Sequence, residues 1–324
     1  MANLKEVRTR IASVSSTQQI TSAMKMVSAA KFRRAQVAII GMRPYANQLN
    51  DIVSDIDTGD GVQTPYHEVR KLEHVLLVVV TSNKGLCGAF NSNVIKQAQA
   101  RIDYYKDNAT QAQPAELSMI TIGKRGSEFF AKRFDNIVGS YDELLDGITF
   151  DSTAILADQL MQQFCEKKYD RIELIYNQFK NSLVQILSTE QFLPIVPRPT
   201  SKAKVDAGAG SMANDYIYEP SKEDILREMI PLMLRSHFYR VLLDSLAAEH
   251  GARMNAMQKA TDNATELLKE LRLSYNKARQ AAINVSRSMF LNSLNSWKEL
   301  LRSWFFAISL FVCSFFSITN ALTH

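Results

Sequence analysis

Apolar residues in the first 43 positions recur with helical spacing, and neither proline nor glycine precedes Gly41. A first stripe has the 3-4-3 spacing of a coiled-coil seam and consists of Leu4, Val7, Ile11 and Val14. After a polar run at 15–19, a second stripe consists of Ile20, Met24 and Val27, followed by Ala30 and Phe32. A stretch this long, rich in strong helix formers and free of breakers, predicts one long helix with Asn3 as its N-cap.

A second long helix is expected from Ser221 to Ile283, with Ser221 as its N-cap and the acids Glu223 and Asp224 in its first turn. Pro231 is expected to kink it or to mark its first turns. Alanine recurs every fourth residue from 248 to 264, which lets another helix approach closely. We expect the two helices to coil around each other antiparallel, as a rod.

Between them the period of the apolar pattern changes. Residues 74–81 (HVLLVVVT) form a continuous apolar, β-branched run, which is typical of a strand buried on both faces. Further strands are expected at 117–123, 136–140, 171–177 and 183–190, and helices at 88–107, 124–134 and 151–168. Strands alternating with helices predict a doubly wound, mostly parallel α/β domain.

The expected organisation therefore has five parts. They are an N-terminal coiled-coil helix at 1–58, a Rossmann-like α/β domain at 70–200, a mobile loop with a short strand (DYIYEP) at 201–220, a C-terminal coiled-coil helix at 221–283, and an atypical hydrophobic tail at 284–324.

Charge is spread unevenly along the 324 residues, whose net charge is +5. Residues 1–43 hold eight Lys/Arg and one acid, a net +7, whereas residues 44–220 hold seventeen Lys/Arg and twenty-three acids, a net −6. A basic helix of this kind favours an anionic partner. The three scattered cysteines and the absence of an apolar N-terminal run fit a reducing compartment without a secretory signal.

Catalytic and cofactor motifs are absent. Gly123-Lys124 lacks the upstream glycine and the hydroxyl residue of a phosphate-binding loop, and the five histidines have no metal-ligand spacing. The turn at 81–88 (TSNKGLCG) follows the first strand, where doubly wound folds often carry ligand groups, but it lacks GxGxxG. Cys87 is expected to be a small buried residue, and Lys31–Arg34 (KFRR) a solvated helix face. No metal, cofactor, nucleic-acid partner or active site is expected.

Several motifs resemble the gamma subunit of F-type ATP synthases. They are ITSAMKMVSAAKFRRAQ at 20–36, RPY at 43–45, NKGLCG at 83–88, YIYEP at 216–220, EHGARMNAMQKATDN at 249–263 and YNKARQA at 275–281. The resemblance covers residues 1 to about 283, in order.

The resemblance implies a non-catalytic central rotor stalk that turns inside a ring of alpha and beta subunits. It also implies contacts with the epsilon subunit and the c ring, coupling of proton flow to ATP synthesis, and a peripheral place on the cytoplasmic side of the cell inner membrane. Four residues match contacts with the alpha and beta ring: Met24, Lys25, Arg279 and Gln280. Six match contacts with the c ring, epsilon or the lever loops of beta: Lys84, Leu86, Cys87, Tyr216, Tyr218 and Glu219.

Residues 284–324 depart from the family pattern. They contain twenty-one uncharged residues at 303–323 and show, on this interpretation, no heptad continuation. A replaced reading frame is favoured over a membrane-seeking extension or a segment packed on the rotor. Two rival functions are a tail-anchored coiled-coil scaffold, which would not need the α/β domain, and a Rossmann-like enzyme, which would need a nucleotide fingerprint.

Overall fold

The computed structural model describes residues 4–57, 64–107, 116–195, 219 and 221–321, with the backbone alone described at 50, 54–57 and 305–321. The chain forms two compact units, one of residues 21–260 and one of residues 1–20 with 261–324. The larger unit thus contains the sheet, the first long helix from residue 21 onward and the second long helix up to residue 260. One apolar core joins these parts, because Leu49 and Leu226 of the helices share it with Leu76 of the sheet.

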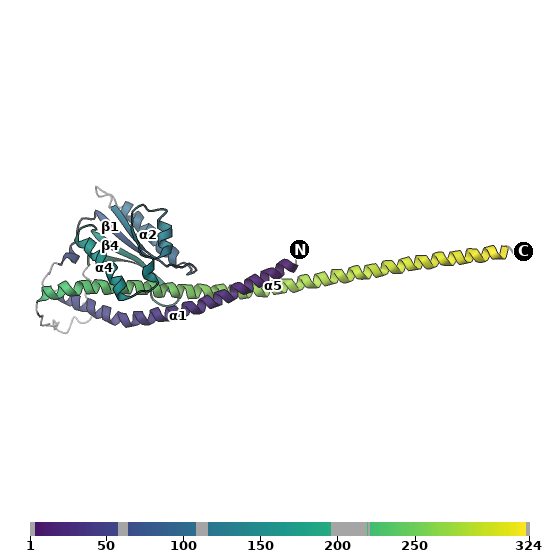
Figure 1. Cartoon of the computed structure of the whole chain (residues 1–324), viewed down its shortest axis with the longest axis horizontal. Helices are drawn as coiled ribbons and strands as arrows, with labels where there is room; N and C mark the ends of the chain where they lie inside the picture. The colour runs from purple at the N-terminus through teal and green to yellow at the C-terminus, as the bar shows by residue number, and fades with distance from the viewer. Residues whose placement is uncertain (1–3, 58–63, 108–115, 196–218, 220, 322–324) are drawn as a thin grey trace, which may run out of the picture. The chain divides into compact units, whose positions relative to one another are not determined.

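The sheet of the larger unit has the strand order β3-β2-β1-β4-β5. Its strands are β1 (His74–Val80), β2 (Glu116–Ile122), β3 (Ile137–Ser140), β4 (Arg171–Phe179) and β5 (Gln185–Leu193). The first four are mutually parallel, and β5 pairs antiparallel with β4. The expected mostly parallel sheet is confirmed (Figure 1).

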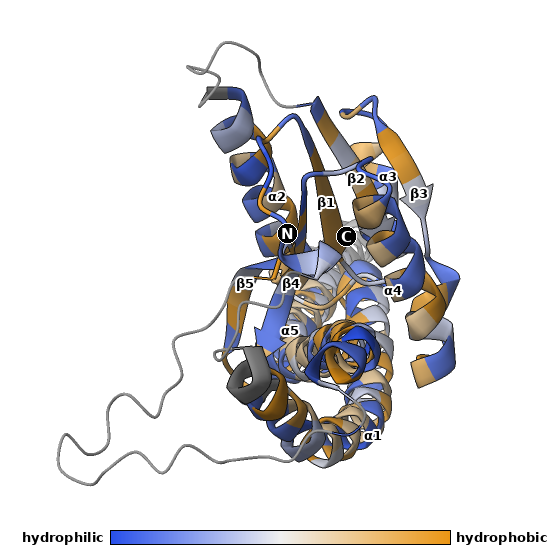
Figure 2. Ribbon diagram, turned by 90° about the vertical axis from the view of Figure 1, so that its left-hand side faces the viewer, coloured by the Kyte–Doolittle hydropathy of each residue, from blue (hydrophilic) through white to orange (hydrophobic). Residues whose placement is uncertain are grey.

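Strand β1 is buried on both faces, as its apolar run predicts. Val75, Leu77 and Val79 pack with helix α2 (Phe90–Asp107), together with Phe130 of α3 (Lys124–Phe130). The alternate residues of β1 pack with α4 (Phe150–Cys165) and with the long helix α5 (Lys222–Ala321). Figure 2 shows β1 as a hydrophobic strand between helices on its two faces. The doubly wound α/β class is confirmed.

Several element boundaries differ from expectation, and two of the differences have a visible local cause. Helix α3 stops at Phe130, whose carbonyl accepts the N–H groups of both Arg133 and Phe134 in a turn. Strand β5 starts at Gln185 because Asn181 organises the hairpin before it: its side-chain oxygen accepts the N–H groups of Leu183 and Val184. A short 3-10 helix, η1 (Pro65–His67), precedes β1, and another, η2 (Glu143–Leu145), follows β3.

Helix α1 (Leu4–Asp57) is continuous, as predicted, but part of its expected apolar stripe is wrong. Ile20 and Val27 are 57% and 58% exposed. The less exposed positions follow an unbroken 4-3 spacing from Val7 to Val53 that passes through Gln18, Thr21, Lys25, Ser28, Phe32, Ala35 and Ile39. In the middle of the helix, the positions that face α5 are therefore polar. The apolar residues there lie on the exposed face instead.

Helix α5 begins as expected, since Ser221 Oγ accepts the N–H of Asp224 at 3.2 Å. It continues through Pro231. In the larger unit, Ala248 and Ala252 are buried against Ala35 and Ile39 of α1, which confirms the close approach of the two helices there. Leu226 and Ile230 share a core with Leu49 and Val53, so α1 and α5 run antiparallel.

In the smaller unit, the two helices are joined by a hydrogen bond from Gln18 Nε2 to Thr265 Oγ1, of 2.7 Å. Val7 of α1 and Ala264 and Leu268 of α5 are buried in this unit.

The second long helix does not end at Ile283 as predicted, since α5 continues to Ala321. The expected absence of a heptad pattern is also wrong. Apolar residues follow a 4-3 spacing from Phe290 to Ile318 through Leu294, Trp297, Leu301, Trp304, Ile308, Phe311 and Phe315. Trp297 and Trp304 are 66% and 70% exposed. None of the described helices is sufficiently long and apolar to span a membrane.

Candidate partner-binding surfaces

The loop after β1 is held in a defined shape by Asn91, at the start of α2. The Asn91 side-chain oxygen accepts the N–H of Ser82 at 3.0 Å, and its amide nitrogen donates to Ser82 Oγ and to Cys87 Sγ. Leu86 and Gly88 have positive φ angles of 63° and 61°. Gly88 adopts this conformation without strain, whereas Leu86 needs the surrounding contacts to keep it.

Within this loop, the predicted contact residues separate into exposed and buried ones. Lys84 is exposed, and Leu86 is 64% exposed. Cys87 is only 2% exposed, as expected for a small buried residue. Lys84 and Leu86 are therefore available to a partner, while Cys87 acts by fixing the loop.

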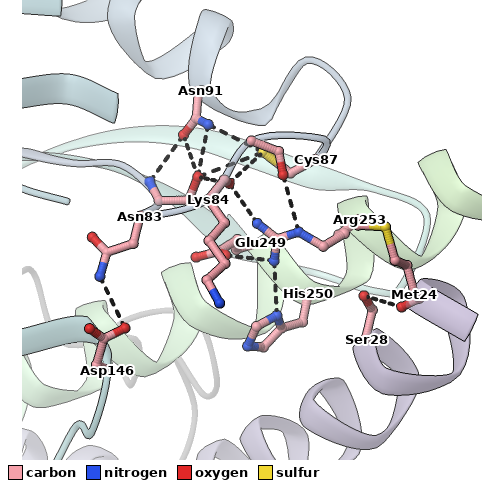
Figure 3. A network of polar contacts seen from close by, with 12 residues as sticks. Met24, Ser28, Asn83, Lys84, Cys87, Asn91, Asp146, Glu249, His250 and Arg253 are labelled. Atoms are coloured by element: carbon pink, nitrogen blue, oxygen red, sulfur yellow. Dashed lines mark hydrogen bonds and ion pairs between the residues drawn. The ribbon is translucent and has the colours of Figure 1, made fainter. Parts of the chain in front are cut away.

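Arg253 of α5 fastens the loop to the long helix (Figure 3). Its Nη2 donates to the carbonyl of Lys84 at 2.7 Å, and its Nε donates to the carbonyl of Gly85 at 3.3 Å. Its Nη1 pairs with Glu249 at 2.6 Å and lies 3.2 Å from His250 Nδ1. Because a guanidinium can only donate, this Nδ1 must be the unprotonated acceptor.

The burial of this cluster changes its ionisation. Burial, with the positive charges of Arg253 and Lys31, lowers the pKa of His250 to about 4. Burial also raises the pKa of Glu249, although Arg253 opposes the change. Arg253 thus serves as the counter-charge of a buried carboxylate and as the donor to the loop.

Asn83 ties the other side of the loop to the segment after β3. Its Nδ2 donates to the carbonyl of Asp142 at 2.8 Å and to Asp146 Oδ1 at 3.2 Å, and its Oδ1 accepts the N–H of Lys124. Gly123 is required close by, since a Cβ there would lie 2.5 Å from the carbonyl oxygen of Thr81. The sequence motifs contained Asn83, Glu249 and Arg253, but nothing in their spacing predicted that they meet.

The helix pair exposes both charge and apolar surface. Met24 and Lys25 are half-buried, and Ser28 Oγ donates to the Met24 carbonyl at 2.7 Å. Lys25 apart, all seven basic residues of α1 are exposed and lie outside the seam: Lys5, Arg8, Arg10, Lys31, Arg33, Arg34 and Arg43. Large apolar residues are also exposed along α1: Ile20, Met26, Val27, Val37 and Ile40.

The remaining predicted contact residues lie elsewhere. Arg279 and Gln280 are exposed on α5 in the smaller unit, and Glu219 is exposed just before α5. Tyr216, Tyr218 and the expected DYIYEP strand lie outside the described residues. The structure therefore brings Lys84, Leu86 and Cys87 together on one loop.

Comparison with known proteins identifies the family. The sequence profile of the ATP synthase family matches residues 3–285. The chain is 52% identical to the ATP synthase gamma chain of Flavobacterium johnsoniae over 285 residues, covering 87% of this chain and 94% of that protein. It is 40% identical to the gamma chain of Geobacter metallireducens over 299 residues, covering 92% of this chain and all of that protein.

Solved structures share the fold. The rotor of the Euglena gracilis mitochondrial ATP synthase matches with a TM-score of 0.60 and 22% identity, covering 86% of this chain and 98% of the other. The central stalk and c ring of the Tetrahymena thermophila enzyme gives a TM-score of 0.51 at 24% identity, with 74% and 99% covered. The chain belongs to the ATP synthase gamma chain family.

Proposed function

We propose that the chain is the central rotor stalk of a rotary F-type ATP synthase. In this role the chain performs no bond chemistry. Rotation of a c ring, driven by proton flow, turns the chain, and its uneven surface opens and closes catalytic sites on surrounding beta subunits. Membership of the gamma chain family supports the assignment.

The observation that carries the proposal is the exposed surface of α1. Cations and large apolar side chains cover the part of this helix that α5 leaves open, including Lys31, Arg33, Val37 and Ile40. Exposed apolar groups beside charge mark a protein-binding surface. A ring of alpha and beta subunits with acidic loops would cover it, and attraction between exposed charges is weak enough to allow sliding.

We assign Met24, Lys25, Arg279 and Gln280 to contacts with that ring. Lys84 and Leu86, on the loop that Cys87 fixes, are assigned to contacts with the c ring, epsilon or the lever loops of beta. Tyr216, Tyr218 and Glu219 are assigned to the c ring or epsilon. Through the c ring the chain would be a peripheral component on the cytoplasmic side of the cell inner membrane.

Co-purification tests the assembly directly. The chain, tagged and expressed with alpha, beta, epsilon and c subunits of a close relative, should recover all four at low salt. A variant with Lys31, Arg33 and Arg34 changed to Ser should release alpha and beta at lower salt than the parent, because three exposed cations are lost. Recovery of the parent chain alone would overturn the proposal.

A further inference from the structure

A second polar cluster joins the α/β sheet to the long helices, away from the Arg253 cluster. Glu190 of β5 is its centre. Its Oε1 accepts a hydrogen bond of 2.8 Å from the hydroxyl of Tyr176 on β4. Its Oε2 lies 3.3 Å from His237 Nε2 and 3.7 Å from Arg240 Nη2, both on α5. The side chains of Glu190, His237 and Arg240 are largely buried.

One turn further along α5, the cluster reaches helix α1. Asp244 is 2% exposed, and its Oδ1 lies 3.6 Å from Arg43 Nη2. The same Arg43 nitrogen donates to the carbonyl of Phe179, the last residue of β4, at 3.2 Å. Arg43 thus contacts a strand and the other long helix at once.

Apolar side chains lie beside the Glu190 end of this cluster, whereas the side chain of Arg43 is 46% exposed. Phe192 of β5 packs against Phe238 of α5, with ring centroids 5.8 Å apart, and Phe238 is fully buried. Apolar burial holds two elements together but has no direction, so it resists sliding poorly. A buried charge pair does the opposite, because a shift of one helical turn leaves each charge without its counterpart.

We propose that Glu190, Arg43 and Asp244 are positioning residues that lock the register between the α/β domain and the two long helices, and so transmit torque between them. The proposal rests on the proposed rotor function. A domain turned by the c ring would load this junction in shear, along the direction that apolar packing leaves soft. The cluster spans the four elements that must turn together: β4, β5, α1 and α5.

The ionisation of the two acids fits this role. Burial alone would raise the pKa of Glu190, but His237, Tyr176 and Arg240 together lower it to about 2. Glu190 therefore stays charged at any physiological pH. Burial raises the pKa of Asp244, and Arg43 is the first group that opposes this. Arg240 opposes it as well, so both arginines favour the charged form of Asp244.

The test uses the complete ATP synthase in vesicles, where ATP hydrolysis pumps protons against an imposed opposing gradient. Glu190→Gln keeps the acceptor for Tyr176 and removes only the charge. Its protons pumped per ATP should equal those of the parent without a gradient and fall about threefold at the steepest gradient, because a weakened lock slips under load. ATP hydrolysis with an ionophore present should be unchanged.

Glu128→Gln is the matched control, since Glu128 pairs with Arg125 at 3.2 Å on an exposed helix surface. It should match the parent at every gradient. Arg43→Gln offers a second variant if Glu190→Gln does not assemble, and Arg43→Lys should restore part of the coupling under load because it keeps the charge. The register lock would be overturned if Glu190→Gln and Arg43→Gln both pump as many protons per ATP as the parent at all gradients. It would also be overturned if both lower this number equally with and without a gradient. Failure of the parent itself to assemble and pump would instead contradict the rotor function.

Discussion

At the scale of single residues, buried ionisable groups bind the loop after β1 to α5. Arg253 is shared between a carboxylate and two loop carbonyls, so its loss would leave Glu249 buried without a counter-charge. Removing one member of a buried pair typically costs about 3–5 kcal/mol. The exposed residues Lys84 and Leu86 thus depend on a part of the chain that is about 170 positions away in the sequence.

His250 should make the folded chain sensitive to acid. Its pKa is about 4 when folded, below the ordinary 6.5, because burial and the nearby Arg253 and Lys31 disfavour its charged form. Below pH 6.5 the unfolded chain therefore binds a proton that the folded chain refuses, and stability falls until pH 4. His250→Gln, which keeps an acceptor for Arg253, should remove about 2–3 kcal/mol of that loss.

Urea unfolding at pH 7.5, 6 and 4.5 would measure this difference. Parent and variant should diverge in slope with pH rather than by a constant offset, and the imidazole titration by NMR should show the lowered pKa directly. His67→Gln is the control, since His67 is a half-buried histidine near η1 and lies outside the cluster around Arg253. An ordinary titration of His250 near pH 6.5 would contradict the expected burial effect.

Met24→Lys should impair coupling more than assembly. Met24 is half-buried beside Lys25 on α1, at a position assigned to the acidic loops of beta. A second long cation there would form an ion pair that must break at each rotational step. Protons pumped per ATP should fall, whereas Met26→Lys, on a different side of the helix, should change the ratio less. Equal ratios for the parent and Met24→Lys would remove the proposed contact.

At the scale of elements, the sequence predicts the sheet better than the helix seam. The run at 74–81 requires burial on both faces, which only a central strand satisfies, and β1 has it. On α1, hydrophobicity alone selects Ile20 and Val27, but Thr21 and Ser28 are the buried positions. An exposed apolar residue that awaits a partner has the same sequence signal as a core residue, so the pattern cannot separate the two.

Contacts within the cluster around Arg253 could not be predicted for another reason. Asn83, Glu249 and Arg253 are polar residues at unrelated spacings, and only the docking of the β1–α2 loop onto α5 brings them together. The cysteine is the exception, since a small apolar residue in a tight turn before a helix is usually buried, and Cys87 is.

Two adjacent isoleucines on α1 test the seam. Ile39 is 2% exposed and lies in the seam against α5, whereas Ile40 is 60% exposed. Ile39→Ala should cost about 2–5 kcal/mol of unfolding free energy because it leaves a cavity. Ile40→Ala should stay within about 0.5 kcal/mol of the parent.

Urea unfolding followed by circular dichroism gives both values under one condition. Co-purification then measures binding to the partner subunits. Ile40→Ala should weaken recovery of alpha and beta although the free chain is as stable as the parent. Equal costs for the two substitutions would show that the seam is misplaced.

At the scale of the whole molecule, the helix α5 extends beyond the part of the chain that resembles the family. The family profile ends at residue 285, while α5 continues to Ala321. Beyond residue 285, eight large apolar side chains are exposed between Met289 and Trp304, at 42% or more each. An exposed apolar surface of this extent favours association with other molecules in water.

Truncation after Ile283 should therefore improve solubility without loss of assembly. In the smaller unit, Gln18 of α1 donates a hydrogen bond to Thr265 of α5. Thr265 precedes Ile283, so this contact between the two helices remains after truncation. Light scattering should show the full chain self-associating as concentration rises, since a regular 4-3 apolar spacing favours pairing of helices, and the shortened chain staying monomeric. A full-length variant with Phe290, Leu294, Trp297 and Leu301 changed to Ser should behave like the shortened chain, which separates the effect of the apolar seam from that of length. If truncation abolishes recovery of alpha and beta while the full chain retains them, residues 284–324 are a working part of the rotor and the expected dispensability is wrong.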